Sequence, residues 1–234
     1  MPIAKINQVF VSIQGEGVFI GVPQIFVRFS GCNLTCKYCD VPRELPEKEF
    51  TVQELCHVIA TLNKKDGPVH SLSLTGGEPL IQADFLRNLL PYLKRKGFKV
   101  YLETNGTLPA KLKKVGRWCD FIAMDIKLPS ATGGKPLWEV HKNFLKESLT
   151  FCPAPKTFVK VVVTGGTIPG DIKYAARFVH GVNSEVTLVI QPVVNRRGKI
   201  TVSAKKLLEF LRLTQKFLPS VRLIPPVHQF LGLP

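Results

Sequence analysis

The sequence predicts a single α/β domain whose parallel strands form a partial, open barrel. Three observations predict this class. Short apolar runs alternate with amphipathic helical patterns, polar motifs follow the apolar runs directly, and 234 residues with 45% hydrophobic content suit one sizeable core. The pattern contains about six strand–helix units, which is too few to close a barrel of eight. We therefore expect an open TIM-like arc of about six βα units.

The expected strands are short runs rich in β-branched, aliphatic and aromatic residues. They cover residues 9–13, 25–29, 71–74, 100–103, 121–125, 158–163, 186–190 and 221–224. The expected helices carry apolar residues at positions i, i+3, i+4 and i+7, and they cover residues 52–62, 83–96, 171–182 and 203–217. Asp171 and Ser203 stand at the starts of the last two helices and are expected to cap them.

Polar motifs follow five of the expected strands. They are Cys32 to Cys39 after 25–29, Thr75-Gly76-Gly77-Glu78-Pro79 after 71–74, Glu103-Thr104-Asn105-Gly106 after 100–102, Asp125-Ile126-Lys127 after 121–124, and Gln191-Pro192 after 186–190. In a parallel barrel the loops that follow the strands converge on one mouth. We therefore expect these residues to form one site.

The first motif spaces Cys32, Cys36 and Cys39 as C-x3-C-x2-C. Cys thiolates are the usual ligands of a [4Fe–4S] cluster, and three of them leave one iron open to another ligand. A structural zinc site would need a fourth ligand at suitable spacing, but the next candidates, Cys56 and His57, fall inside an expected helix. Residues 1–16 show no signal-peptide pattern, so we expect a cytoplasmic protein without disulfides. The remaining thiols, Cys56, Cys119 and Cys152, share no ligand spacing and are expected to be buried.

The chain is strongly basic, with 32 Lys and Arg against 17 Asp and Glu and a formal net charge of +15. Such a balance favours anionic ligands or nucleic acid. The basic residues are spread over helix faces and loops without the aromatic interleaving of RNA-binding platforms, so we expect a small anionic ligand and no direct nucleic-acid binding. No apolar run is long enough to span a membrane.

The three cysteines, followed in order by the Gly-Gly-Glu-Pro and Glu-Thr-Asn-Gly motifs, resemble the radical S-adenosylmethionine (SAM) superfamily. The resemblance implies a radical SAM core in which Cys32, Cys36 and Cys39 hold a [4Fe–4S] cluster whose open iron binds SAM. It also implies that one electron entering the cluster cleaves SAM to methionine and a 5′-deoxyadenosyl radical, which abstracts a hydrogen atom from the substrate.

The same resemblance assigns residues to SAM. The implied contacts are Tyr38, Gly76, Gly77, Glu78, Asp125, Ile126, Lys127, Ser130 and Gln191. These types are chemically suitable, because glycines allow close backbone approach, a carboxylate suits the SAM ammonium, and the ring of Tyr38 offers a face to adenine. Asp125 and Lys127 have the alternative of pairing with each other.

The N-terminal segment narrows the resemblance. Residues 10–17, 21–23 and 26–34 are similar to the 7-carboxy-7-deazaguanine synthases, and the similarity runs from Phe10 to the last residue, thinning between Pro129 and Phe158. Members of that family convert 6-carboxy-5,6,7,8-tetrahydropterin into 7-carboxy-7-deazaguanine with loss of ammonia, in the biosynthesis of 7-deazapurines such as queuosine and archaeosine. The resemblance therefore implies a carbon–nitrogen lyase.

The implied substrate contacts are Ile13, Gln14, Gly15, Glu16, Arg28, Thr75, Glu103, His228 and Pro234. Arg28 suits the pterin carboxylate, which a guanidinium can bind with two hydrogen bonds. Its alternative is a salt bridge at the strand end. Glu103 suits the 2-amino and ring N–H edge of the pterin, and its alternative is an ordinary loop or helix-cap acid. At Pro234 the terminal carboxylate itself is implied to contact the substrate.

One position departs from the family pattern. Many members have Asp-Thr after the third cysteine, and the threonine hydroxyl binds a Mg²⁺ that also holds the substrate; here the pair is Asp40-Val41. Valine offers no oxygen ligand, whereas Mg²⁺ prefers several oxygens and readily keeps waters. The ion could still bridge the substrate and solvent, with Asp40 contacting its water ligands, so the sequence leaves Mg²⁺ open as a cofactor and does not predict that it is required.

The resemblance leaves two enzyme classes and one non-enzymatic class to compare. The runner-up to the deazaguanine synthase is an enzyme that activates a glycyl-radical protein with the same cluster, and an iron–sulfur electron carrier is disfavoured because it has no use for an open iron. The expected partners are a small pterin, an electron donor such as flavodoxin or ferredoxin, and a second copy in a homodimer. The expected divisions are a substrate loop at 10–24, a cluster loop at 30–41, a core barrel at 25–224 and a C-terminal tail at 225–234.

Overall fold

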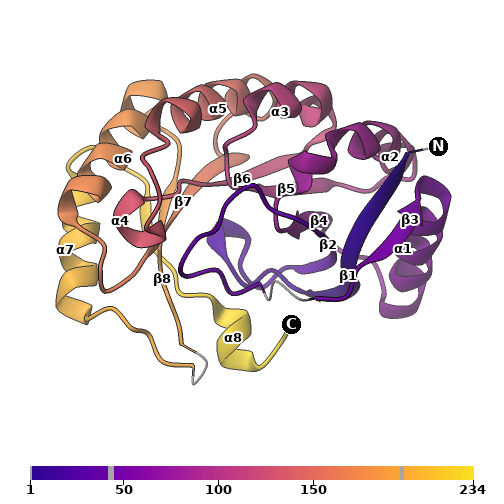
Figure 1. The fold of residues 1–234 in the computed structure, drawn as a ribbon, viewed down its shortest axis with the longest axis horizontal. Coiled ribbons are helices and arrows are strands. Elements are labelled where there is room, and N and C mark those ends of the chain that lie inside the picture. Colours follow the sequence, from indigo (N-terminus) through magenta and orange to yellow (C-terminus); the bar gives the residue numbers. More distant parts are fainter. Residues whose placement is uncertain (1, 42–44, 196–197) are drawn as a thin grey trace.

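The computed structural model describes residues 2–41, 45–195 and 198–234, and its fold is a single α/β domain built on one sheet (Figure 1). Within these residues the sheet has nine strands in the order β3-β1-β2-β4-β5-β6-β7-β8-β9. The strands are β1 (Ile3–Ile13), β2 (Pro23–Phe29), β3 (Lys48–Thr51), β4 (Ser71–Gly76), β5 (Val100–Thr104), β6 (Phe121–Asp125), β7 (Thr157–Val163), β8 (Leu188–Pro192) and β9 (Val221–Leu223). β1 pairs antiparallel with β2 and β3, and the strands from β2 to β9 pair in parallel along the rest of the order.

Helices cover the outer, convex face of this curved sheet (Figure 1). The helices on this face include α1 (Val52–Asp66), α2 (Ala83–Arg95), α3 (Pro109–Val115), α5 (Trp138–Phe151), α6 (Pro169–Val182) and α7 (Ala204–Gln215). The shorter helices of the described chain are α4 (Pro129–Thr132), α8 (Val227–Leu231) and the 3-10 helices η1 (Gly17–Phe19), η2 (Pro79–Gln82) and η3 (Gly116–Trp118). In the described chain, each of β4 to β8 is followed by an α-helix before the next strand, and β2 is followed by the edge strand β3 and then α1, which gives six βα units. The sheet does not close, so the predicted open arc is confirmed.

Each expected strand and helix is present; β6 has the expected ends, and the others differ by one or more residues at one or both ends. β1 begins at Ile3 instead of residue 9, and β8 extends to Pro192. Ser203 caps α7 as predicted, because its side chain accepts a hydrogen bond from the Lys206 N–H. The cap predicted at Asp171 is wrong: α6 begins earlier, at Pro169, and the Asp171 carboxylate instead accepts a hydrogen bond from the Ser130 N–H at 2.9 Å.

The sequence pattern missed β3, α5 and the short helices α3, α4 and α8. In β3 and α5, polar residues stand where the pattern requires apolar ones. β3 reads Lys-Glu-Phe-Thr and pairs at the sheet edge through its backbone, which needs no apolar side chains. In α5 the inward positions include His141 and Ser148, both 0% exposed, and these polar residues interrupt the helical period. Ser148 satisfies its hydroxyl by donating to the Phe144 carbonyl.

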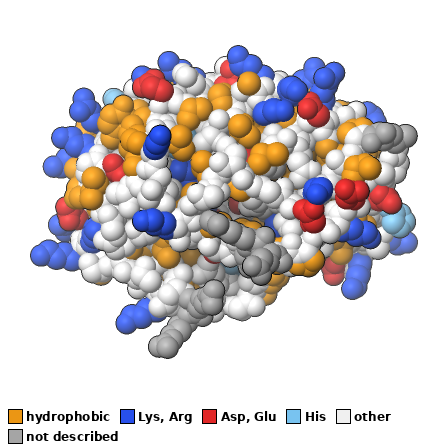
Figure 2. Space-filling view, in the orientation of Figure 1, with side chains coloured by type: hydrophobic (Ala, Val, Ile, Leu, Met, Phe, Trp, Pro, Cys, Tyr) orange, Lys and Arg blue, Asp and Glu red, His pale blue; other side chains and the backbone are white. Residues whose placement is uncertain are grey.

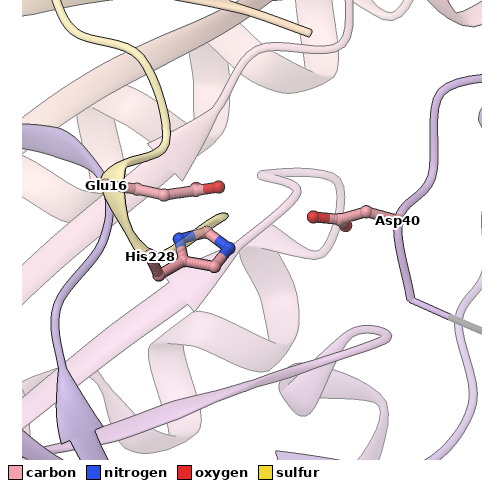
Figure 3. Close-up of side chains that lie close together, drawn as sticks. All are labelled: Glu16, Asp40 and His228. Carbon is pink, nitrogen blue, oxygen red and sulfur yellow. The ribbon is translucent and has the colours of Figure 1, made fainter. Parts of the chain in front are cut away.

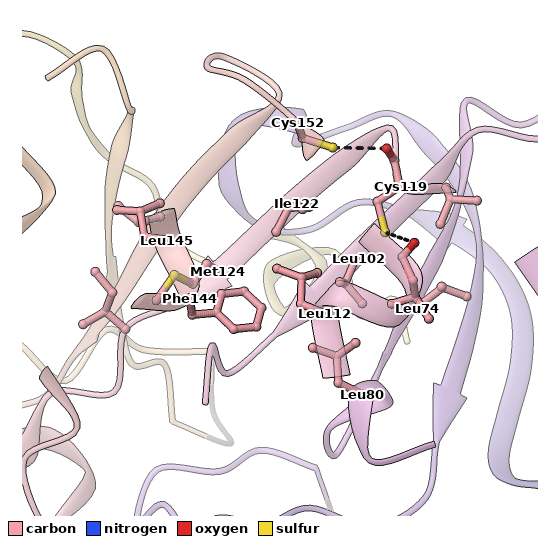
Figure 4. Packing of buried hydrophobic residues seen from close by; sticks show 14 of the residues in the cluster. Leu74, Leu80, Leu102, Leu112, Cys119, Ile122, Met124, Phe144, Leu145 and Cys152 are labelled. Atoms are coloured by element: carbon pink, nitrogen blue, oxygen red, sulfur yellow. Dashed lines mark hydrogen bonds between the residues drawn. The ribbon is translucent and has the colours of Figure 1, made fainter. Parts of the chain in front are cut away.

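The alternation of side chains along each strand produces two separate apolar cores. The outward residues pack against the helices in the main core, part of which Figure 4 shows around Leu102, Ile122 and Met124. Cys119 and Cys152 are buried in it and hydrogen-bond to backbone carbonyls (Figure 4). Cys56 is buried as well, so the prediction of buried thiols is confirmed at all three positions.

The second core fills the inside of the barrel and holds the N-terminal loop. Tyr101, Phe158 and Val189 are its buried members, and Val18 and Phe19 of η1 pack against them. Two backbone hydrogen bonds, Gln14 N–H to the Val22 carbonyl and Gly21 N–H to the Gln14 carbonyl, close the loop at 2.8 Å each. The loop is therefore anchored by apolar residues while Gln14, Gly15 and Glu16 stay at the mouth.

Figure 2 shows Lys and Arg side chains scattered over the visible face, many of them along its edge. Among the described residues, no helix has the length and apolar character needed to cross a membrane.

Candidate active site

The polar residues of the inner strand face line one cavity of about 450 Å³ at the barrel mouth. Successive side chains along a strand point to opposite faces of the sheet, and these residues occupy the positions that face the inside of the barrel. The lining strand residues include Arg28 of β2, Thr75 of β4, Glu103 of β5, Asp125 of β6, Lys160 of β7 and Gln191 of β8. A cavity of this size suits a small molecule.

The cysteine loop forms one wall of this cavity. Cys32, Cys36 and Cys39 all line it; Cys32 and Cys39 are exposed and Cys36 is half-buried. The loop rests on the Gly76-Gly77 turn, where the Glu78 N–H donates to the Gly31 carbonyl at 2.8 Å. A Cβ at Gly77 would lie 2.0 Å from the Gly31 carbonyl oxygen, so only glycine allows this approach. Three accessible thiols on a backbone held in this way fit a cluster with one open iron.

Glu78 lies behind this turn and does not line the cavity. It is 0% exposed, and its carboxylate accepts hydrogen bonds from the Leu80 N–H at 3.0 Å, the Thr104 hydroxyl at 2.9 Å and the Asn105 N–H at 2.7 Å. Burial raises the pKa of Glu78 to about 7, and the donated hydrogen bonds counteract that rise. In this structure the carboxylate joins the turns after β4 and β5. Ile126 and Ser130 also lie outside the cavity lining.

Four charged residues form a buried network across the mouth. Lys160 pairs with Glu16 and lies 3.7 Å from Asp125, which accepts from Lys127 at 2.7 Å. The alternative pairing of Asp125 with Lys127 is therefore confirmed, although both residues still line the cavity. Burial alone would raise the pKa of Glu16, but the Lys160 ammonium outweighs it and lowers the pKa below its ordinary value. The acidic neighbours likewise outweigh burial and raise the pKa of Lys160.

Three buried polar atoms beside this network have no hydrogen-bond partner among the described residues. They are the Tyr38 hydroxyl, Asp125 Oδ1 and Gln191 Oε1, and their residues all line the cavity. Buried polar atoms are normally paired, so these three fit a ligand that brings its own donors and acceptors. SAM carries an ammonium, ribose hydroxyls and an adenine amino group, and the residues present fit it on this ground.

Glu103 ends a chain of buried hydrogen bonds that begins deep inside the barrel. Its Oε1 accepts from the Ser73 hydroxyl at 2.7 Å and from Gln14 Nε2 at 3.0 Å, while its Oε2 has only the longer contact with Thr75 at 3.4 Å. Gln14 Nε2 also donates to Gln24 Oε1 at 3.0 Å. Burial, followed by repulsion from Glu16, raises the pKa of Glu103. Glu103 is therefore a strand residue with one freer oxygen at the cavity, not a loop or cap acid.

Arg28 lines the same cavity without a carboxylate partner in the described chain. Its guanidinium lies 5.4 Å from the ring centroid of Phe10, which stacks on Phe26. Cation–π contact of this kind positions the guanidinium and leaves its N–H groups free. The alternative of a strand-end salt bridge is absent among the described residues.

The C-terminal tail also contributes residues to the cavity at the barrel mouth. The Val227 N–H donates to the Gly15 carbonyl at 2.9 Å, and His228, Gln229 and Pro234 line the cavity. His228 lies together with Glu16 and Asp40, as Figure 3 shows, with one ligand atom of each within 4.8 Å of the others. Both Glu16 oxygens already accept hydrogen bonds, from Lys160 and Gln191, and the ammonium repels a cation. This group therefore lacks the several free oxygens that Mg²⁺ prefers.

Two functional positions were missed from the sequence. Lys160 is the single charge in the run Thr-Phe-Val-Lys-Val-Val-Val, and a lone lysine in a buried strand was the signal that marks it. Asn105 belongs to a motif that was noticed but received no role, and it lines the cavity beside Cys32.

An open βα barrel with three accessible thiols and a polar cavity at its mouth defines an iron–sulfur enzyme that acts on a small molecule. The family model of the radical SAM superfamily matches residues 26–150. The 7-carboxy-7-deazaguanine synthase of Geobacter sulfurreducens is 39% identical, and the alignment covers 99% of this chain and 98% of that protein. The one from Archaeoglobus fulgidus is 35% identical, covering 98% of this chain and 99% of that protein.

The chain therefore belongs to the radical SAM superfamily and, within it, to the family of the 7-carboxy-7-deazaguanine synthases. Membership of the superfamily implies a [4Fe–4S] cluster and SAM. Among solved structures, QueE from Escherichia coli has a TM-score of 0.65 at 21% identity, covering 95% of this chain and 93% of that one. A radical SAM methyltransferase from Sphaerobacter thermophilus has a TM-score of 0.62 at 13% identity, covering 86% of this chain and 66% of that one. These structures share the fold.

Proposed function

We propose that this chain is a lyase that converts 6-carboxy-5,6,7,8-tetrahydropterin into 7-carboxy-7-deazaguanine with loss of ammonia. The observation that carries the proposal is the pair Glu103 and Arg28 in one cavity with the three thiols. Glu103 offers a freer carboxylate oxygen to an N–H edge. Arg28 offers to a carboxylate a guanidinium that has no carboxylate partner among the described residues. A carboxylated pterin presents both groups.

The cluster and SAM would supply the radical chemistry, and they would be bound at the side of the cavity that the cysteine loop forms. Cys32, Cys36 and Cys39 would hold the cluster, and Tyr38, Asp125 and Gln191 would meet SAM with their unpartnered atoms. When bound, this pair supplies a 5′-deoxyadenosyl radical that takes a hydrogen atom from a neighbouring carbon.

The residues of the chain orient the substrate for that step. Gln14 and Ser73 hold Glu103 at the cavity wall, so its acceptor is already positioned before the pterin arrives. Glu16 is kept ionised by Lys160 and lies beside His228, so its negative charge faces the cavity even though both of its oxygens already accept a hydrogen bond. The tail is fixed to Gly15 through Val227, and His228, which lines the cavity, would contact the pterin.

The names of the relatives do not favour the runner-up, an enzyme that activates a glycyl-radical protein. A reductant such as flavodoxin or ferredoxin, a homodimer and a cytoplasmic location stay predictions from the family resemblance, as does the direct contact of Glu78, Ile126 or Ser130 with SAM.

The experiment that tests the proposal is anaerobic reconstitution followed by incubation with SAM, a strong reductant and the carboxytetrahydropterin, with the products separated by mass spectrometry. We expect 7-carboxy-7-deazaguanine together with 5′-deoxyadenosine. Cys36→Ala should abolish both products, because a lost ligand removes the cluster, while the matched variant Cys56→Ala, at a buried thiol outside this cavity, should keep both. Formation of 5′-deoxyadenosine with no deazaguanine would contradict the substrate assignment and leave the radical chemistry standing.

A second arm addresses the substrate carboxylate. Arg28→Met should raise KM for the pterin by about 10 to 100-fold, because a hydrogen bond to a charged group contributes about 1.5 to 3 kcal/mol. Arg87→Met, which removes an exposed arginine on α2, is the matched control and should leave KM unchanged. Equal KM values for the two variants would show that Arg28 does not bind the carboxylate.

A further inference from the structure

Asn105, in the turn after β5, ties that turn to the cluster loop through a closed ring of side-chain hydrogen bonds. Asn33 Nδ2 donates to Thr107 Oγ1 at 2.8 Å, Thr107 Oγ1 donates to Asn105 Oδ1 at 2.6 Å, and Asn105 Nδ2 donates back to Asn33 Oδ1 at 2.9 Å. Asn105 is 5% exposed, so little water competes with these bonds. The ring holds the first cysteine of the cluster loop next to β5.

The orientation of the Asn105 amide follows from the backbone. The Thr107 N–H can only donate, and it donates to Asn105 Oδ1 at 3.1 Å, which assigns the other side of the amide to nitrogen. That nitrogen, Nδ2, lies 3.9 Å from Cys32 Sγ, and the Leu34 N–H reaches the same sulfur at 3.4 Å. Among the described residues, the sulfurs of Cys36 and Cys39 receive no N–H donor. Cys32 is therefore distinguished from the other two thiols by its hydrogen bonds.

The peptide of Asn105 is held on both sides. Its N–H donates to Glu78 Oε2 at 2.7 Å, and its carbonyl oxygen is 3.1 Å from His141 Nε2. A carbonyl only accepts, so Nε2 carries the proton. His141 is 0% exposed, and burial lowers its pKa to about 4, so the ring is neutral. His141 reaches Asn105 from α5 on the outer side of the sheet and does not line the cavity.

Hydrogen bonds to the sulfurs that bind an iron–sulfur cluster change the reduction potential of the cluster. The reduced cluster carries one more negative charge than the oxidised cluster, and an N–H aimed at a thiolate sulfur stabilises the more negative form. An amide near Cys32 therefore makes the cluster easier to reduce. The size of this effect depends on the distance and direction of the amide N–H relative to Cys32 Sγ. Residues that fix the Asn105 backbone therefore also influence the reduction potential.

We propose that Asn105 raises the reduction potential of the cluster through its N–H on Cys32, and that His141 is a positioning residue that acts through the Asn105 carbonyl. The proposal rests on the cluster that the superfamily implies and not on the identity of the substrate. Its test therefore needs neither the pterin nor turnover, and a failure of the proposed reaction would leave the test unaffected.

The test is a potentiometric titration, followed by electron paramagnetic resonance, of reconstituted holoprotein without SAM, at matched iron and sulfide content. Asn105→Leu should lower the equilibrium constant for reduction about tenfold, which is about 59 mV for one electron. His141→Leu should shift the potential in the same direction by less. His141→Gln should restore it, because the glutamine amide can donate to the same carbonyl. Asn143→Leu, at an exposed position on α5, is the matched control and should leave the potential unchanged.

The result that would overturn the role of Asn105 is an unchanged or higher potential in Asn105→Leu at full cluster content. If Asn105→Leu fails to hold a cluster, the comparison of His141→Leu with His141→Gln tests the proposal instead. A lower potential in His141→Leu than in His141→Gln supports the proposal, and equal potentials overturn it. A purely structural role would change cluster content or stability without moving the potential of the cluster that remains.

Discussion

Lys160 of β7 and Glu16 of the N-terminal loop, 144 residues apart in sequence, form an ion pair inside the barrel. Their side chains are 14% and 18% exposed, so both charges have lost most of their water. Each depends on the other, because a single charge left in such a place would be uncompensated. The pair joins the loop that carries Gln14 and Gly15 to the sheet that carries Glu103 and Asp125.

Lys160→Met should lower the free energy of unfolding by about 3 to 5 kcal/mol, since it leaves Glu16 buried without its cation. The double variant Lys160→Met/Glu16→Gln should recover part of that loss, because no lone charge remains. Denaturant unfolding measures both, and Lys156→Met, an exposed lysine just before β7, is the control, with an expected change within about 0.5 kcal/mol. A Lys160→Met protein as stable as the control variant would contradict the pairing.

Gly17→Ala should destabilise the protein more than Gly21→Ala. Both glycines have positive φ, 67° and 89°, and a left-handed conformation costs about 1 to 2 kcal/mol in a residue with a Cβ. At Gly21 a Cβ would meet nothing within 4 Å, whereas at Gly17 it would lie 2.6 Å from the Phe158 ring and add about 1 to 3 kcal/mol of overpacking. Urea unfolding of the two variants compares them directly, and equal losses would show that η1 is not seated against Phe158.

Gln24→Met should raise KM for the substrate more than it lowers kcat. Gln24 is 0% exposed and links Gln14 to the Ser71 hydroxyl at 2.8 Å, so its loss frees Gln14, which holds Glu103. The matched control is Ser12→Ala at the position paired with Gln24 on β1, because the Ser12 hydroxyl has no partner among the described residues. In steady-state kinetics, Ser12→Ala should have the KM and kcat of the wild type. An unchanged KM in Gln24→Met would show that Gln24 does not help to position the substrate.

The stability of the protein should fall with pH between about 6.5 and 4 because of His141. Burial lowers its pKa in the folded state to about 4, whereas the unfolded chain titrates near 6.5, so in this window the unfolded state binds the extra proton. The contribution is present above about pH 6.5 and is lost as pH falls, by about 3 kcal/mol at most.

His141→Gln removes the titrating group and should flatten this part of the stability profile. Asn143→Gln, on the exposed side of the same helix, should keep the wild-type slope. The measurement is the free energy of unfolding at several pH values, and identical slopes in all three proteins would contradict the assignment to His141.

Local patterns in the sequence were sufficient to predict the open barrel, because the strands and helices that were predicted carry their apolar period within about ten residues. The errors arose because the prediction used only these local patterns. α5 was missed because His141 and Ser148 occupy inward positions, and β3 was missed because an edge strand can pair through its backbone alone. The start of α6 was misplaced because Asp171 receives a hydrogen bond from Ser130, a partner 41 residues away.

The sequence by itself determined the chemistry that this protein can hold. The spacing of Cys32, Cys36 and Cys39 specifies three cluster ligands, and the polar motifs after successive strands meet at one mouth because parallel strands end together. Only the tertiary structure decided which partner each polar group takes. It pairs Lys160 with Glu16, turns the Glu78 carboxylate away from the cavity toward Asn105, and brings the Asn105 amide to Cys32. These choices depend on which strands are neighbours and which face each residue occupies, and buried charges and amides must find partners across that geometry.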